Sequence, residues 1–170
     1  TGFIEGGSFG VGQPAPSRMQ VGKPLGYFYG YKTNGIFQNQ AEVDAAPSQI
    51  ALGAEAQAGD IRYVDMNNDG VINTSDRTDI GSPIAASTMG FNMQFGYKNF
   101  DFVTYLFASI GNDMVRNYER SLTDVNRLDY VLDRWTGEGT SNSAPRVTTS
   151  ATSNNVFSDY FVEDASFLRI

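Results

Sequence analysis

The chain has 170 residues, of which 41% are hydrophobic and 13% aromatic, and 12 basic against 19 acidic residues give a net charge of −7. The length suits one ordinary domain, and the acidic balance argues against nucleic-acid binding, which needs a basic face. The sequence has no histidine and no cysteine, which excludes imidazole catalysis, thiol chemistry, disulfides and zinc sites built from these residues.

The first part of the chain predicts loops, one strand and a short helix. Residues 1–13 are rich in glycine and predict a loop, whereas the aromatic run 23–31 predicts a strand. The Asn34-Gly35 pair is a tight-turn signal. Alanine and glutamine dominate the residues that follow, and they predict a short helix around residues 49–57 that Gly59 ends.

Residues 87–97 show the clearest periodic pattern in the chain. Large apolar side chains alternate there with small or polar ones, which predicts a strand with one apolar face; these are Met89, Phe91, Met93, Phe95 and Tyr97. A second apolar run, 100–110, follows after Lys98-Asn99, so the two runs predict a β-hairpin. Each arm has 11 residues, whereas strands average about 5–6 residues in soluble proteins and about 9–11 in membrane barrels.

After the hairpin, residues 111–113 end the second strand. A helix is predicted over residues 123–135, because four apolar side chains share one helical face: Val125, Leu128, Leu132 and Trp135. The tract 140–155 is rich in Ser, Thr and Asn and predicts a long polar loop, and aromatic alternation predicts a further strand over residues 160–168.

No apolar run in the sequence reaches the ~18 residues that mark a membrane helix, and no signal peptide is recognisable. Hydropathy does not reveal the strands of a membrane β-barrel, because only every second residue faces lipid. The long hairpin therefore leaves both a soluble β-rich protein and a membrane barrel open.

Residues 65–76 follow the calcium-loop pattern D-x-[DN]-x-[DN]-G. The candidate oxygen ligands at loop positions 1, 3, 5, 7, 9 and 12 are Asp65, Asn67, Asp69, the Val71 carbonyl, Asn73 and Asp76. Gly70 permits the sharp turn and Ile72 is expected to anchor the loop by packing. Asp76 replaces the glutamate of an EF-hand, and the flanking sequence favours strands over helices. Two interpretations stay open: a structural Ca²⁺ site, or an Asx-rich turn without metal.

The remaining candidate sites have simpler interpretations. The glycine-rich string 7–12 neither follows a strand nor opens a helix, which favours a loop over a phosphate cradle. The aromatic cluster 27–31 favours a core or a membrane-interface girdle over sugar stacking. A glycosidase needs a pair of carboxylates, and the candidate pairs are Glu163 with Asp164 and Glu138 with Asp133. Nothing in the sequence indicates that the two members of either pair lie together in a site. We therefore predict no catalytic residues and no enzyme.

An ordered series of motifs resembles the C-terminal part of the SusC/RagA family of TonB-linked outer-membrane proteins of Bacteroidetes. The series covers nearly the whole chain from Val21 onward and lies at residues 21–31, 35–38, 59–70, 76–83, 111–113, 134–136 and 158–170. Two departures are small: Ala58 stands where the family usually has proline, and Val162 where leucine is common.

The resemblance implies an all-β fold, a fragment of a large antiparallel transmembrane β-barrel with long extracellular loops and one short helix in a loop. Residues 1–170 would be the C-terminal portion of a TonB-dependent receptor without its plug, with extracellular loops at 33–86 and 111–159. The hairpin would cross the outer membrane, with Lys98-Asn99 as a periplasmic turn and Asn92 and Gln94 toward the lumen.

The function that the resemblance implies is import of oligosaccharides, peptides or other nutrients across the cell outer membrane. The implied partners are a SusD-like surface lipoprotein, the TonB complex acting through a missing N-terminal part, and outer-membrane lipid. The alternative is a secreted soluble β-rich module with a calcium loop, serving binding or adhesion. A polar outer face on residues 87–110 would defeat the membrane interpretation.

Overall fold

The computed structural model describes residues 2–7, 16–116 and 128–170. The strands are β1 (Phe3–Glu5), β2 (Ser17–Gln20), β3 (Tyr27–Gly30), β4 (Thr33–Ile36), β5 (Ile61–Tyr63), β6 (Thr78–Gly81), β7 (Ser87–Tyr97), β8 (Phe100–Ile110), β9 (Asp113–Val115), β10 (Val162–Asp164) and β11 (Phe167–Arg169). One α-helix, α1 (Gln40–Ala45), and short 3-10 helices at Ile50–Leu52, Thr74–Asp76, Asp129–Asp133 and Asp159–Phe161 complete the described elements.

The strands form four antiparallel sheets, in the orders β1-β2-β3-β6, β4-β5, β10-β9 and β11-β8-β7. None of these sheets closes on itself. The predicted fold class, an all-β fragment of an antiparallel barrel with one short helix in a loop, is confirmed. Of the predicted strand at 23–31, only Tyr27–Gly30 forms a strand, β3. Of the predicted strand at 160–168, residues 160 and 161 lie in a 3-10 helix, and the strand positions are divided between β10 and β11.

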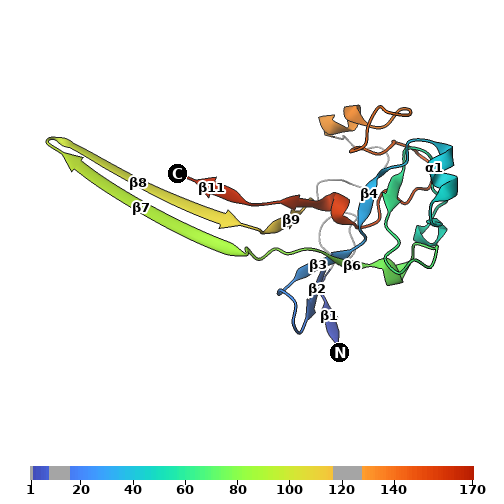
Figure 1. The fold of residues 1–170 in the computed structure, drawn as a ribbon, viewed down its shortest axis with the longest axis horizontal. Coiled ribbons are helices and arrows are strands. Elements are labelled where there is room, and N and C mark those ends of the chain that lie inside the picture. Colours follow the sequence, from blue (N-terminus) through green and yellow to red (C-terminus); the bar gives the residue numbers. More distant parts are fainter. Residues whose placement is uncertain (1, 8–15, 117–127) are drawn as a thin grey trace.

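The β7–β8 hairpin is confirmed at every predicted bound. The two strands pair without a break from Ser87 opposite Ile110 to Tyr97 opposite Phe100. Lys98 has a φ of 53°, which supplies the left-handed turn residue that a tight two-residue connection needs. The hairpin extends away from the rest of the molecule as one long ribbon (Figure 1). Few tertiary contacts therefore cover its faces, and every residue of β7 is exposed.

The two faces of this hairpin differ strongly in chemistry. Residues directly opposite one another share a face, so the register defines an apolar face made of Met89, Phe91, Met93, Phe95 and Tyr97 with Phe100, Phe102, Thr104, Leu106, Ala108 and Ile110. The five β7 side chains on this face are 43–60% exposed. The outer face is thus apolar and not polar. The opposite face is only half polar, because β8 adds Val103, Tyr105 and Phe107 to Asn92 and Gln94 of β7.

Most of the other described residues pack into what we call the lobe, residues 27–82 and 128–162. Its core has two aromatic-rich clusters, one around Tyr31, Ile61, Tyr63 and Ile72 and one around Phe28, Phe157 and Phe161. Residues from both predicted loops, 33–86 and 111–159, therefore build one core. The aromatic cluster of β3 belongs to it, since Tyr27, Phe28 and Tyr31 are buried.

Both helix predictions need correction. Residues 49–57 hold only the 3-10 helix Ile50–Leu52, ended by Gly53 with φ 117°, and the α-helix lies earlier because Asn39 caps its first turn by accepting from the Glu42 amide. Of the predicted helix 123–135, residues 123–127 lie outside the described residues, and residues 129–133 are 3-10. Leu128 and Leu132 are 52% and 75% exposed, so no buried helical face holds this segment. In the described part of the chain, no helix has the length and apolarity to cross a membrane.

Candidate functional site

The 65–76 loop connects β5 to β6 and ends in the 3-10 helix Thr74–Asp76. Its turn depends on two left-handed residues, Asn68 with φ 59° and Gly70 with φ 84°. Ile72 is fully buried in the lobe core, as predicted. The Gly70 carbonyl accepts from Ser48 N at 3.0 Å, and Ile72 N donates to the Ser48 carbonyl at 2.8 Å. The loop is thereby fixed to the lobe at its midpoint.

Asp65 is the organising carboxylate of this loop. It accepts from the backbone N–H groups of Asn68, Asp69 and Gly70 at 2.6, 3.3 and 2.8 Å. Desolvation raises the pKa of Asp65, but hydrogen bonds from backbone N–H groups, that of Gly70 foremost, outweigh it and lower the pKa below its ordinary value. Asp65 therefore stays ionised into mild acid and presents a fixed negative charge at the loop.

The other predicted ligands divide into two groups. Asp69 is exposed and Asn73 half-buried. Asp69 Oδ1 accepts from Val71 N at 2.9 Å, and Asn73 Nδ2 donates to the Val71 carbonyl at 3.1 Å. Asn67 Nδ2 donates to Asp69 Oδ2 at 2.9 Å. Asp76 instead is buried, and its two oxygens accept from Met66 N and Asn73 N at 2.9 and 2.8 Å. It closes a capping box on the 3-10 helix.

These contacts are the side-chain to backbone bonds of an Asx-rich turn. Within the described ranges, no group of three or more Asp or Glu side chains is arranged to hold a metal ion. Oxygens of Asp65, Asn67, Asp69 and Asn73 and the Val71 carbonyl still share one exposed loop. Calcium binding by this loop stays a prediction. Asp76, one of the predicted ligands, uses both carboxylate oxygens for its bonds to Met66 N and Asn73 N instead.

A buried carboxylate, Asp60, joins the two halves of the lobe, residues 27–82 and residues 128–162. It is fully buried and forms a two-point ion pair with Arg146, Nε to Oδ1 at 2.7 Å and Nη2 to Oδ2 at 3.1 Å. Asn154 Nδ2 donates to Oδ1 at 2.9 Å and Gln57 N to Oδ2 at 3.0 Å. Residues some 90 positions apart in sequence thus share one carboxylate, which holds the 144–155 segment against β5.

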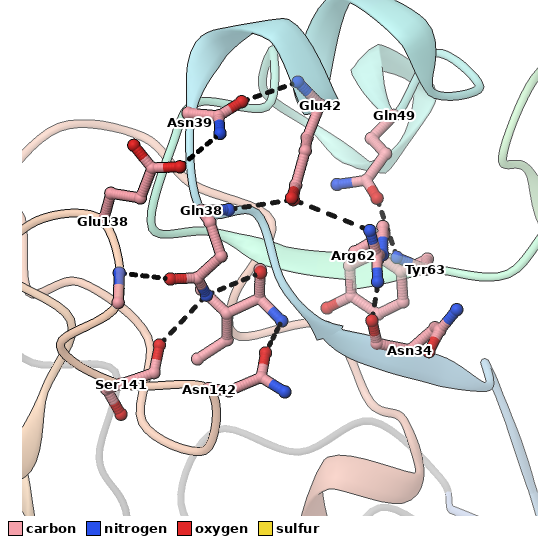
Figure 2. A network of polar contacts seen from close by, with 12 residues as sticks. Asn34, Gln38, Asn39, Glu42, Gln49, Arg62, Tyr63, Glu138, Ser141 and Asn142 are labelled. Carbon is pink, nitrogen blue, oxygen red and sulfur yellow. Dashed lines mark hydrogen bonds and ion pairs between the residues drawn. The ribbon is translucent and has the colours of Figure 1, made fainter.

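A second polar network, drawn in Figure 2, links α1 and β4 to the 138–142 segment. Gln38 Nε2 donates to the Ser141 carbonyl at 3.1 Å, and Asn142 Oδ1 accepts from Ile36 N at 3.0 Å. Glu42 accepts from Gln38 N at 3.0 Å and lies 3.6 Å from Arg62. Side chains thus bond to the backbone groups of β4 that do not pair with β5. The 138–142 segment is therefore held to β4 by side-chain to backbone hydrogen bonds.

Gln49 and Tyr63 form further buried polar contacts in the lobe. The Gln49 side chain is buried and bonds both backbone groups of β5, donating to the Ile61 carbonyl at 3.1 Å and accepting from Tyr63 N at 2.8 Å. The Tyr63 hydroxyl donates to the Ser153 carbonyl at 2.7 Å. Burial raises the pKa of Tyr63. The hydroxyl is therefore a structural donor and not an acid–base group.

A cavity of about 500 Å³ opens beside the Asp60 network. Its described lining comes from residues 130–134, 144–155 and 160. Arg146, Thr152 and Asn154, which all bond to Asp60, form one side of it. The volume lies within the range of about 300–1,000 Å³ typical of small-ligand sites. No motif in the sequence marks this site, since its lining residues follow no recognisable pattern.

The remaining sequence candidates form no catalytic centre in the described residues. Glu163 faces Arg116 at 3.4 Å, and Glu138 accepts from Asn39 at 2.8 Å. Asp164 binds the Ser166 amide at 2.8 Å. The string 7–12 lies outside the described residues except for Gly7. Glu163, Glu138 and Asp164 thus each have a structural partner, and Asp133 lies in the 3-10 helix Asp129–Asp133.

Comparison with known proteins agrees with the resemblance that the motifs indicate. No family model matches the chain. The chain is 31% identical over 158 residues, 91% of its length, to TonB-dependent receptor P26 of Formosa agariphila, and 29% identical over 89% of its length to TonB-dependent receptor P3 of the same organism. It is 29% identical over 90% of its length to TonB-dependent receptor SusC of Bacteroides thetaiotaomicron.

The matched region is nearly the whole chain but a small part of each relative. The chain spans 16%, 15% and 14% of the lengths of receptor P26, receptor P3 and SusC. The resemblance to TonB-linked receptors, SusC among them, is confirmed.

Proposed function

We propose that the chain is part of a TonB-dependent transporter of the cell outer membrane that imports oligosaccharides or other nutrients. In this proposal the β7–β8 hairpin crosses the membrane, Lys98-Asn99 lies on the periplasmic side, and the lobe lies outside the cell. Similarity to TonB-dependent receptors over about 90% of the chain supports it.

The observation that carries the proposal is the long hairpin with one apolar face. Eleven residues per strand at about 3.4 Å each give a length of about 37 Å. Tilted by about 40°, such a strand spans about 28 Å, close to the apolar band of an outer-membrane barrel (about 25 Å). A soluble protein would have to cover this face with other elements, whereas lipid covers it without any.

The partners and the ion of this proposal follow from the same assignment. Energy would come from the TonB complex, and a SusD-like surface lipoprotein would meet the extracellular side, where the lobe lies. The 65–76 loop would hold Ca²⁺ in a structural role, since Ile72 joins it to the lobe core. The proposed role is transport without catalysis.

Cell fractionation with an uptake assay tests the proposal. A chromosomal copy with an epitope tag is expected in the outer-membrane fraction, resistant to extraction with carbonate. Deleting residues 87–110 should abolish uptake of the oligosaccharide that supports growth of the parent strain. Recovery of the natural protein in the soluble secreted fraction, monodisperse without detergent, would overturn the proposal and favour the secreted module.

A further inference from the structure

The cavity beside Asp60 has an electrostatic character opposite to that of the chain. Its described lining holds two arginines, Arg134 and Arg146, and no Asp or Glu, although acidic residues outnumber basic ones by 19 to 12 in the sequence. The Arg146 charge is balanced by its two-point contact with Asp60. Arg134 therefore supplies the net positive charge of this cavity.

Arg134 has donors to spare. Among the contacts of the described residues, its guanidinium makes one hydrogen bond, a long one of 3.4 Å from Nη1 to the Val131 carbonyl, and no described carboxylate lies within ion-pair distance. A guanidinium can donate five hydrogen bonds in a planar fork that fits a carboxylate or sulfate group. This side chain thus keeps donors that could pair with an anion.

The other lining groups favour a ligand rich in hydroxyls. Thr148 and Thr152 are among the lining residues, as are Tyr130 and Tyr160 from two 3-10 helices. Hydroxyls exchange hydrogen bonds with sugar hydroxyls in either direction, and aromatic rings pack against apolar faces. The Asp60 network fixes one side of the cavity before a ligand arrives, which lowers the ordering cost of binding.

We propose that this cavity binds an acidic saccharide, whose carboxylate or sulfate group pairs with the Arg134 guanidinium. The inference rests on the proposed function, because an imported nutrient would meet the lobe on the outer side of the membrane. It narrows the nutrient class to saccharides that carry negative charge.

Calorimetric titration of the protein in its longest natural form, purified in detergent, tests this inference with three probes of matched size: digalacturonate, sulfated galactobiose and neutral galactobiose. At least one acidic probe is expected to bind tenfold or more tightly than the neutral one, and added salt should weaken that binding. The two acidic probes distinguish a carboxylate ligand from a sulfate ligand.

Two variants complete the experiment. Arg134→Gln should weaken binding of the acidic probe at least tenfold and leave the neutral probe unchanged, whereas the control Lys98→Gln, which removes one positive charge at the distant hairpin turn, should change neither. Equal affinity for acidic and neutral probes, no binding of either acidic probe, or unchanged affinity in Arg134→Gln would each overturn the inference. Outer-membrane location and uptake are measured separately, so this result leaves the proposed function standing.

Discussion

Removal of the buried Asp60 carboxylate is expected to weaken the contact between the two halves of the lobe and to lower its free energy of unfolding. Asp60→Ala deprives Arg146 of both ion-pair contacts, at 2.7 and 3.1 Å, and leaves the Gln57 amide without its 3.0 Å acceptor. Breaking a buried ion pair by deleting one partner costs about 3–5 kcal/mol. Since the Arg146 side chain keeps 17% exposure, the lower end applies, about 3 kcal/mol.

Trp135 provides the assay, because it is the single tryptophan of the chain and its ring lies against Gly59. A Cβ on Gly59 would meet the Trp135 ring and the Arg146 side chain, and Trp135 N donates to the Ala144 carbonyl at 2.8 Å. Denaturant titration in detergent, followed by its fluorescence, reports the free energy of unfolding of the lobe. Hydrogen exchange at the Arg146 amide, which donates to the Gly59 carbonyl at 2.8 Å, should rise on the order of a hundredfold.

The matched control is Glu55→Ala, which deletes an exposed carboxylate from the same segment. It should change the unfolding free energy by less than about 0.5 kcal/mol. If Asp60→Ala were no more destabilising than Glu55→Ala, the assignment of Asp60 as the joint of the lobe would be refuted.

Three further outcomes are expected. Ile72→Ala, at a fully buried position, should lower the melting temperature through a loss of about 2–4 kcal/mol, whereas Val71→Ala, 38% exposed, should have little effect. Gly59→Ala should destabilise more than Gly53→Ala by about 1–3 kcal/mol in denaturant titration, because both have positive φ but only the Gly59 Cβ meets the Trp135 ring. Millimolar Ca²⁺ should raise the melting temperature of the parent chain and not that of Asp65→Ala, and unchanged melting with Ca²⁺ or chelator would favour the metal-free turn.

The stability of the 65–76 loop is expected to fall at acidic pH. The pKa of Asp65 is lowered in the folded chain, so its contribution is present above the ordinary carboxyl pKa and is lost as pH falls through the lower folded value. The protection of the Gly70 amide, its exchange rate relative to the intrinsic rate at the same pH, should therefore fall only in that acidic range, because this amide donates to Asp65 at 2.8 Å. A fall in this protection near neutral pH would contradict the assignment.

The hairpin could be predicted to the residue because its signal is local. The alternation over residues 87–97 indicates which side chains share a face. The two-residue turn at Lys98-Asn99 then fixes the register of every residue pair between the two strands. The capping signal of α1 was equally local, Asn39 with Glu42 three positions later, but alanine-rich composition directed the prediction to residues 49–57. Composition is a weak guide where capping decides the start of a helix.

The lobe could not be predicted, because its contacts join residues far apart. Asp60 meets Arg146 and Asn154 some 90 positions later, and no periodic pattern marks such a pair. In the described part of the helix predicted over residues 123–135, residues 129–133 are 3-10 instead of α-helical for a related reason. Its apolar positions Leu128 and Leu132 stay exposed, and without tertiary burial a short amphipathic stretch lacks most of its stabilisation.

The central claim, that one face of β7 meets lipid, is tested most directly by labelling neighbouring positions in the absence of any native cysteine. Phe95→Cys on the apolar face and Gln94→Cys on the opposite face, each carrying an environment-sensitive fluorophore, are compared in vesicles of ordinary and brominated lipid. Brominated lipid should quench strongly at position 95 and little at position 94. Equal quenching at both positions, or quenching at position 94 alone, would contradict the central claim.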